Sequence, residues 1–167
     1  MSIPLPPVDT LIDQLAAQMR PHMTPDTVLV GIHTGGVWIA ERLQGLLGLT
    51  RPPASIDVSF HRDDHHLGNG LKAGGKVSHL PDHTEGAHLV VVDDVLNTGR
   101  TIRAALNEIF DYGRPAKVEL AVLADRGGRE LPVAATYCPL QVTVPADRSL
   151  KLVRDDAGRL AFSLDEK

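Results

Sequence analysis

Residues 89–101 read L-V-V-V-D-D-V-L-N-T-G-R-T, and the fold expected for the chain follows from these residues. Residues 89–92 are apolar and mostly β-branched, which predicts a short strand that is buried on both faces. Asp93 and Asp94 stand at the expected carboxyl end of this strand, the edge where open α/β sheets bind their ligands. An amphipathic helix is predicted from the apolar positions Thr101, Ile102, Ala105, Leu106, Ile109 and Phe110. The order of these features predicts an α/β fold with a ligand site beside the acidic pair.

The turn between this strand and this helix contains the small residues Thr98, Gly99 and Thr101. Backbone N–H groups at a helix N-terminus bind a phosphate favourably, so the turn predicts a phosphate site. The two aspartates are then placed for sugar hydroxyls or for a metal ion. Aspartates at a strand end also cap ordinary turns, so the pair alone leaves both interpretations open.

A second strand and turn repeat this arrangement nearer the start of the chain. Residues 28–32 predict a buried strand, and Thr34, Gly35 and Gly36 separate it from a helical pattern that begins at Val37. A plain strand-to-helix turn also favours glycine, so this turn by itself is a weak phosphate signal. The repetition nevertheless predicts a parallel sheet with helices packed on it.

Length and composition limit the class of protein. The chain has 167 residues, of which 43% are hydrophobic and 23% are charged, as expected for a single globular domain over residues 1–167. The formal net charge of −4 argues against a surface built throughout for nucleic acid. The net charge does not exclude a local basic patch.

Cysteine content and hydropathy indicate where the protein works. Cys138 is the only cysteine, which excludes an internal disulfide and a cysteine-rich zinc site and suits a reducing compartment. The sequence shows no secretory leader pattern and no apolar run near the ~18 residues that span a bilayer. We expect a cytoplasmic protein with no membrane contact.

The other segments supply helices, strands and one long irregular stretch. Residues 8–19 have the apolar spacing of a packing helix, and residues 117–124 read as another core strand. Residues 55–60 alternate polar and apolar, which predicts a half-buried strand near a sheet edge. Short strands are expected in the C-terminal part, about residues 138–167, near positions 140–144, 150–154 and 160–164.

Residues 61–86 lack periodicity, and a stretch of this length predicts a functional lid or disorder. Histidines are frequent in and around it, which raises the alternative of a metal site. Neither fixed helical spacing nor a cysteine supports a metal, so we favour a solvated loop. The histidines concerned are His61, His65, His66, His79, His83 and His88.

The stretch 89–101 closely resembles the signature of the type I phosphoribosyltransferases, which bind 5-phosphoribosyl 1-diphosphate (PRPP). The resemblance implies a central, mostly parallel twisted sheet flanked by helices, with a mobile lid and a small hood. It also implies that Asp93 and Asp94 bind the ribose hydroxyls. The 5′-phosphate would be bound by the turn and helix start, and the diphosphate by the earlier glycine turn. The residues implied for PRPP are Thr34, Gly35, Gly36, Asn97, Thr98, Gly99, Arg100 and Thr101.

Several further motifs over residues 28–137 resemble the PyrR family: G-I-H-T-G-G, F-H-R-D-D, Y-G-R-P and L-A-D-R-G-G-R-E-L-P. Members of that family are uracil phosphoribosyltransferases that in many bacteria also regulate the pyrimidine operon by binding its messenger RNA. The resemblance implies that Val95, Asp125, Arg126 and Gly127 lie in the nucleobase region. It also implies homodimers or homotetramers.

The implied reaction converts uracil and PRPP to UMP and diphosphate. Asp93, Asp94 and, in a closed lid, Arg62 would be catalytic, with Arg62 paired to the diphosphate. The resemblance implies Mg²⁺ between the diphosphate and the ribose, near Asp93 and Asp94 through ribose hydroxyls or water. Little proton chemistry is required.

Two departures from the family patterns keep alternatives open. Asn97 stands where 6-oxopurine phosphoribosyltransferases have an aspartate, and an amide cannot act as a general base, which disfavours purine salvage. Gly35 stands where the PyrR pattern has an arginine, and residues 138–141 replace a lysine-containing segment, so binding to an mRNA leader is disfavoured. A regulator that senses UMP and controls transcriptional attenuation with little turnover stays as the alternative.

Overall fold

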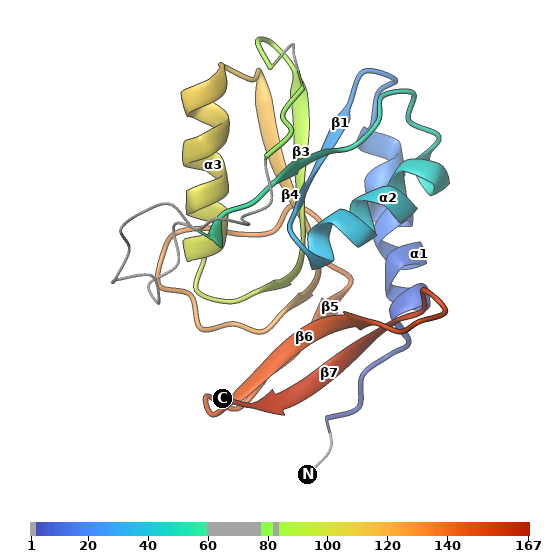
Figure 1. Cartoon of the computed structure of the whole chain (residues 1–167), viewed down its shortest axis with the longest axis vertical. Helices are drawn as coiled ribbons and strands as arrows, with labels where there is room; N and C mark the ends of the chain where they lie inside the picture. The colour runs from blue at the N-terminus through green and yellow to red at the C-terminus, as the bar shows by residue number, and fades with distance from the viewer. Residues whose placement is uncertain (1–2, 60–77, 82–83) are drawn as a thin grey trace.

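The structure is a computed structural model that describes residues 3–59, 78–81 and 84–167. Its centre is a five-stranded parallel sheet with the strand order β2-β1-β3-β4-β5 (Figure 1). This sheet confirms the predicted α/β fold class. The strands are β1 (Val28–Ile32), β2 (Ala54–Ile56), β3 (His88–Leu96), β4 (Lys117–Asp125) and β5 (Leu140–Gln141).

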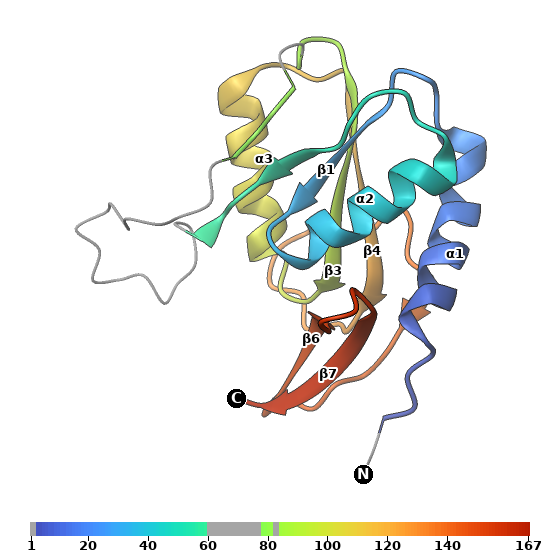
Figure 2. The ribbon, with the colours of Figure 1, turned by 45° about the vertical axis from the view of Figure 1, so that its right-hand side comes forward.

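Helices cover both faces of the sheet. Helices α1 (Val8–Met19) and α2 (Gly35–Leu47) pack on one face, and α3 (Arg100–Tyr112) packs on the other (Figure 2). A short 3₁₀ turn, Arg20–His22, follows α1. The predicted packing helix is confirmed, because its apolar positions are all buried: Val8, Leu11, Ile12, Leu15, Ala16 and Met19.

The pleat of β3 explains why residues 89–92 are all apolar. Val90 and Val92 belong to the core cluster under α1 and α2, whereas Leu89 and Val91 belong to the cluster under α3. Alternate side chains of a strand point to opposite faces, so a strand between two helical layers must be apolar throughout. All four side chains are fully buried, as predicted.

A two-stranded antiparallel hairpin, β6 (Arg148–Arg154) and β7 (Leu160–Glu166), follows the sheet. It lies beside the carboxyl ends of the central strands (Figures 1 and 2). The Arg154 guanidinium stacks over the Trp38 ring of α2 at 4.5 Å from the ring centroid, which ties the hairpin to the helical layer. The last two predicted strands are therefore confirmed, with slightly wider bounds.

Three predicted strand boundaries are wrong. Strand β3 continues through Leu96, because its register with β4 extends to the Leu96–Asp125 pair, so the acidic pair lies inside the strand. Strand β2 is Ala54–Ile56 and fully buried, shorter and less exposed than the expected strand over residues 55–60. Strand β5 has two residues, since its parallel pairing with β4 ends at Gln141.

The expected solvated position of His88 is also wrong. His88 begins β3, where its Nε2 lies 2.5 Å from Glu119 Oε1 and its Nδ1 lies 2.9 Å from Thr27 Oγ1. The Tyr137 hydroxyl donates to the other Glu119 oxygen at 2.9 Å. These groups form a buried polar network at the amino ends of β3 and β4. Only tertiary packing brings them together, because residues 27, 88, 119 and 137 are far apart in the sequence.

Most of the predicted lid, residues 61–86, lies outside the described residues, and so do Arg62, His61, His65, His66 and His83. Among the histidines of the predicted lid, His79 is described, and it forms an isolated bridge with Ser55 of β2. In the part of the chain that the structure describes, no helix has the length and hydropathy to cross a bilayer.

Candidate functional site

The acidic pair is fixed by backbone N–H groups. Asp93 is 9% exposed, and its Oδ1 accepts a hydrogen bond from the Asp94 N–H at 2.9 Å. Asp94 Oδ1 accepts the N–H of Val95 at 2.8 Å, and Asp94 Oδ2 accepts the N–H of Leu152 in the hairpin at 3.3 Å. The hairpin thus takes part in orienting Asp94.

The glycine turn after β1 packs directly against this pair. A Cβ on Gly35 would lie 2.8 Å from Asp94 Oδ2, and a Cβ on Gly36 would collide with the carbonyl oxygen of Val92. Only glycine permits so close an approach between two backbones. The earlier of the two predicted phosphate turns therefore lies directly against the acidic pair.

The boundaries of this turn differ from the expected ones. Gly35 and Gly36 form the first turn of α2, which begins two residues before the predicted start at Val37. Thr34 is the N-cap residue, and the peptide bond between His33 and Thr34 is cis. The backbone N–H groups at this end of α2 are therefore directed outward from the helix start, beside Asp94.

The second turn, residues 97–101, leads into α3. Gly99 is the N-cap residue with φ 94°, a conformation that side chains disfavour, and Thr98 Oγ1 accepts the Arg100 N–H at 3.2 Å. Arg100 Nε donates to Glu130 Oε2 at 2.9 Å. Thr101 lies in the first helical turn. This geometry suits an anion, since a helix N-terminus presents unsatisfied N–H groups.

The loop after β4 is stiffened by an ion pair. Arg129 Nη2 donates to Asp125 Oδ2 at 2.6 Å, and the Gly127 N–H donates to Asp125 Oδ1 at 2.9 Å. Burial alone would raise the pKa of Asp125, but these hydrogen bonds and the Arg129 charge outweigh it and lower the pKa below its ordinary value. Asp125 therefore stays ionised.

The predicted nucleobase residues do not all face one space. Asp125, Arg126 and Gly127 line a hollow of about 290 Å³ together with residues 141–143. Val95 packs instead in a small apolar cluster with Leu150 of the hairpin. The Arg126 guanidinium donates to the carbonyl oxygens of three residues before and in the hairpin, Val144, Pro145 and Arg148, so it ties the loop to the hairpin.

Sequence reasoning missed three contributors to this site. Arg129 stands four residues after Asp125 in a quoted motif, and that spacing was a usable signal for the ion pair. Gly31 was read only as a strand residue, although a Cβ there would lie 2.7 Å from the Gly36 carbonyl oxygen. Leu152 contributes through its backbone N–H, which no sequence pattern marks.

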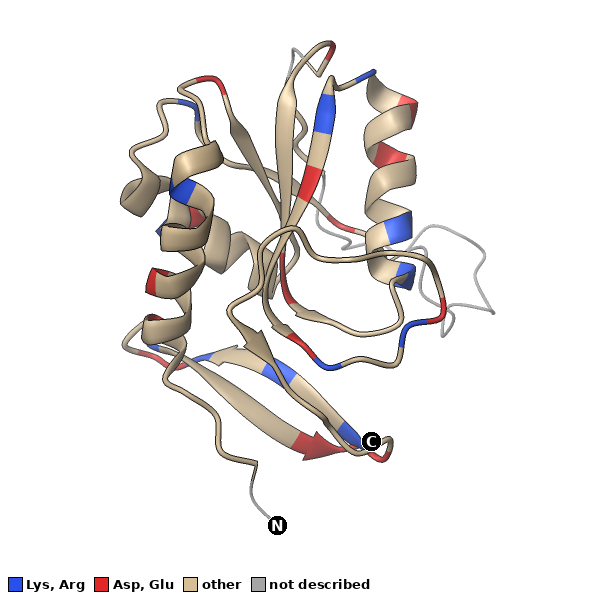
Figure 3. Cartoon of the chain, turned by 180° about the vertical axis from the view of Figure 1, so that it is seen from behind, with Lys and Arg blue, Asp and Glu red and all other residues tan. Residues whose placement is uncertain are grey.

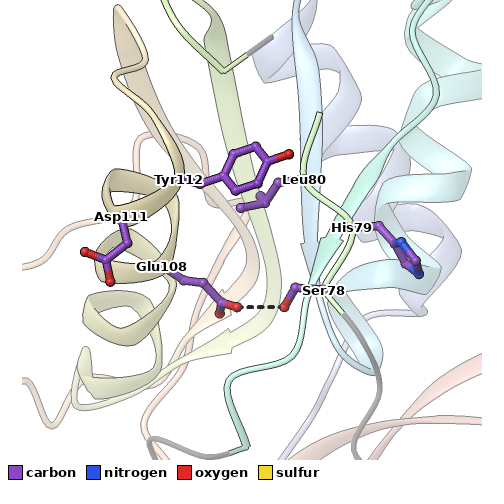
Figure 4. Close-up of a pocket in the computed structure, with 6 residues that line it drawn as sticks. All are labelled: Ser78, His79, Leu80, Glu108, Asp111 and Tyr112. Carbon is purple, nitrogen blue, oxygen red and sulfur yellow. Dashed lines mark hydrogen bonds between the residues drawn. The ribbon is translucent and has the colours of Figure 1, made fainter. Parts of the chain in front are cut away.

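Two larger hollows lie elsewhere. The first, about 450 Å³, lies between residues 78–80 and α3, where Ser78 Oγ donates to Glu108 Oε1 at 2.9 Å (Figure 4). The second, about 360 Å³, lies where residues 51–54 and 79–81 meet. Neither is lined by a predicted site residue within the described part of the chain, so we assign neither to the site at the acidic pair.

Comparisons with known proteins agree with the fold. The chain matches the family described as "Phosphoribosyl transferase domain" over residues 5–147. It is 46% identical to a Bifunctional protein PyrR from Pseudomonas paraeruginosa over 92% of this chain and 91% of the relative. A Bifunctional protein PyrR from Ralstonia nicotianae is 47% identical, over 95% of this chain and 94% of that one. A solved purine phosphoribosyltransferase from Pyrococcus horikoshii is 29% identical with a TM-score of 0.62, covering 81% of this chain and 83% of the other.

Proposed function

Since the chain belongs to the phosphoribosyl transferase family, and within it to the PyrR family, we propose that it converts uracil and PRPP to UMP and diphosphate. The family and the fold class predicted from the sequence are thereby confirmed. The observation that carries the activity is the close approach of Gly35 to Asp94, which places the N-terminus of α2 beside the acidic pair.

The ribose would bind at the acidic pair. We assign Asp93 and Asp94 to the ribose hydroxyls, where their charge stabilises the positive charge that develops at the anomeric carbon as the diphosphate leaves. The Val95 and Leu152 N–H groups hold the Asp94 carboxylate in one orientation, so it need not reorganise during the reaction.

The two phosphate-bearing ends of PRPP would bind at the two helix starts. Thr98, Gly99, Arg100 and Thr101, with Asn97 before them, would hold the 5′-phosphate at the start of α3. Thr34, Gly35 and Gly36 would hold the diphosphate at the start of α2. Arg62, outside the described residues, is proposed to pair with the diphosphate from the lid.

The donor chemistry of the site fits Mg²⁺ bound mainly through its substrate. Mg²⁺ prefers carboxylate, phosphate and water oxygens, and Asp93 and Asp94 supply carboxylates at the proposed ribose position. Among the described residues, no three His, Cys, Asp or Glu side chains form a metal-binding group. The ion would therefore be shared with the diphosphate and ribose. When bound, it would neutralise charge on the leaving diphosphate.

The base would bind near the hollow beside Asp125, Arg126 and Gly127, with Val95 close by in the sheet. Asn97 has an amide where 6-oxopurine enzymes have an aspartate, so it cannot take a proton from a purine ring. This supports uracil over hypoxanthine or guanine. The solved purine enzyme shares the fold, and its name says nothing about the base that this chain takes.

A steady-state assay with Mg²⁺ and PRPP tests the activity. Uracil, hypoxanthine and guanine are offered side by side, and UMP is the expected product. Turnover of a purine but not uracil would reverse the base assignment. If no base turned over but UMP bound tightly, the enzyme assignment would fail and a sensing role would replace it.

The relatives are named bifunctional, which supports a second role for this chain. We propose that this second role is the regulation of pyrimidine nucleotide biosynthesis. We expect direct binding to an mRNA leader to be weak. The charged residues of α1, Asp9 and Asp13, are both acidic, and Arg42 of α2 is paired with Asp9 at 2.8 Å. Charges of both signs are interspersed on the hairpin (Figure 3). A gel shift with leader RNA and UMP tests this, and light scattering tests the proposed homodimer or homotetramer.

A further inference from the structure

The proposed 5′-phosphate turn is held by the loop that follows β4. The Arg126 N–H donates to the Leu96 carbonyl oxygen at 3.0 Å. The N–H groups of Glu130 and Leu131 both donate to the Thr98 carbonyl oxygen, at 2.9 and 3.1 Å. The carbonyls on either side of Asn97, that of Leu96 at the end of β3 and that of Thr98 in the turn, are thus bonded to backbone groups of one loop.

The carbonyl between them is held by a side chain. Arg129 Nη1 donates to the Asn97 carbonyl oxygen at 2.6 Å, while its Nη2 donates to Asp125 at 2.6 Å. The Arg129 side chain is 26% exposed and that of Asp125 is 17% exposed, so water competes little for these bonds. The guanidinium therefore bridges the end of β4 and the start of the phosphate turn.

Because of peptide geometry, holding these carbonyl groups also fixes the directions of the N–H groups that follow them. In a trans peptide the carbonyl and the following N–H point in opposite directions. Of the described residues, only the His33–Thr34 peptide is cis, so the peptides of this turn are trans. Holding the Asn97 carbonyl toward Arg129 therefore turns the Thr98 N–H away from the loop, and the neighbouring tethers do the same for Asn97 and Gly99.

We propose that Arg129 is a positioning residue for the phosphate site: it aims the Thr98 N–H at the phosphate by holding the Asn97 carbonyl. The proposal rests on the function proposed above. It differs from direct contact, because the two Nη atoms already donate to Asn97 and Asp125. Gly128, in the same loop, packs closely against the Asn97 side chain, since a Cβ on Gly128 would lie 2.8 Å from Asn97 Oδ1.

The test compares ligands with and without a phosphate. Arg129→Met keeps an unbranched apolar stem but removes the guanidinium donors, and Arg129→Lys keeps one charged donor group. We expect Arg129→Met to weaken binding of UMP and of ribose 5-phosphate about tenfold, with uridine changed less than about twofold. KM for PRPP should rise more than kcat falls, and Arg129→Lys should recover part of the loss.

Arg159→Met is the matched control, because Arg159 also pairs with an aspartate four residues earlier, Asp155, but on the exposed hairpin turn. It should leave all these affinities unchanged. Equal losses for UMP and uridine, or no loss for ribose 5-phosphate, would overturn the role of Arg129. These binding readouts need no turnover. A wild type that bound ribose 5-phosphate without making UMP would defeat the proposed reaction, and the effect of Arg129→Met would still decide the positioning role.

Discussion

Polar groups are hydrogen-bonded differently at the amino ends and at the carboxyl ends of β3 and β4. At the amino ends, Glu119 lies between His88 and Tyr137, and each of its oxygens is bonded to one of them. At the carboxyl ends, the hydrogen bonds join one loop to another and fix the backbone around Asp93 and Asp94. At the amino ends, the polar side chains are hydrogen-bonded to one another. At the carboxyl ends, the hydrogen bonds hold the backbone around the proposed binding site. We therefore expect changes at the amino ends to alter stability and changes at the carboxyl ends to alter activity.

The largest effect is expected at the carboxyl ends. Replacing both acids, Asp93→Asn with Asp94→Asn, keeps their shape but removes the charge that stabilises the ribose cation. Turnover should fall at least about 10³-fold while the melting temperature changes little. Steady-state UMP formation and thermal unfolding measure the two quantities.

The control for this double variant is Asp13→Asn with Asp156→Asn, which makes the same change in charge at two exposed positions. Near-normal turnover in the acidic-pair variant would show that the ribose assignment is wrong. A large loss of melting temperature would instead show that Asp93 and Asp94 stabilise the fold, which would break the contrast between the two ends.

At the amino ends, Glu119→Gln should reverse this pattern. Glutamine keeps one carbonyl acceptor and has an NH₂ donor in place of the other oxygen, so either His88 or Tyr137 loses its acceptor. A buried group without its partner costs about 1–3 kcal/mol. We expect the free energy of unfolding to fall by that amount in urea titrations, with KM for PRPP unchanged. The exposed substitution Glu41→Gln is the control. An altered KM would show that the two ends are coupled.

The same network predicts a dependence on pH. Burial would raise the pKa of Glu119, but the hydrogen bonds from His88 and Tyr137 and the Lys117 and His88 charges outweigh it and lower the pKa below 4.5. The unfolded chain then binds the proton more readily, so this stabilisation is present above pH 4.5 and is lost as pH falls through the folded pKa. The stability gap between wild type and Glu119→Gln should narrow from about pH 6 to about pH 3. A constant gap would contradict the lowered pKa.

The smallest effect is expected for Tyr137→Phe. The variant removes one hydrogen bond to Glu119 and keeps the ring, so the loss should be about 1 kcal/mol. Since the Tyr137 hydroxyl lowers the pKa of Glu119, the stability of the variant should also decline at a slightly higher pH than that of wild type. Urea titrations across the same pH range would detect both changes.

Local patterns were enough to find the central elements of the fold. Residues 89–92 are apolar because both faces of β3 are covered, and the spacing of α1 matches the face that it buries. The end of β3 could not be read in this way. Pairing with β4 carries the strand through Asp93 and Asp94 to Leu96, and a local pattern does not record the length of a neighbouring strand.

The residues of the candidate site could be proposed from the sequence, whereas their contacts could not. Asp93, Asp94 and the two glycine turns carry the family motifs, so the sequence alone identified them and the family. The contact of Gly35 with Asp94, the Leu152 N–H and the Arg129 tether were decided by tertiary structure. A motif records which chemical groups are present. Their mutual orientation depends on backbone atoms that only the packing of parallel strands, loop and hairpin brings within hydrogen-bonding distance.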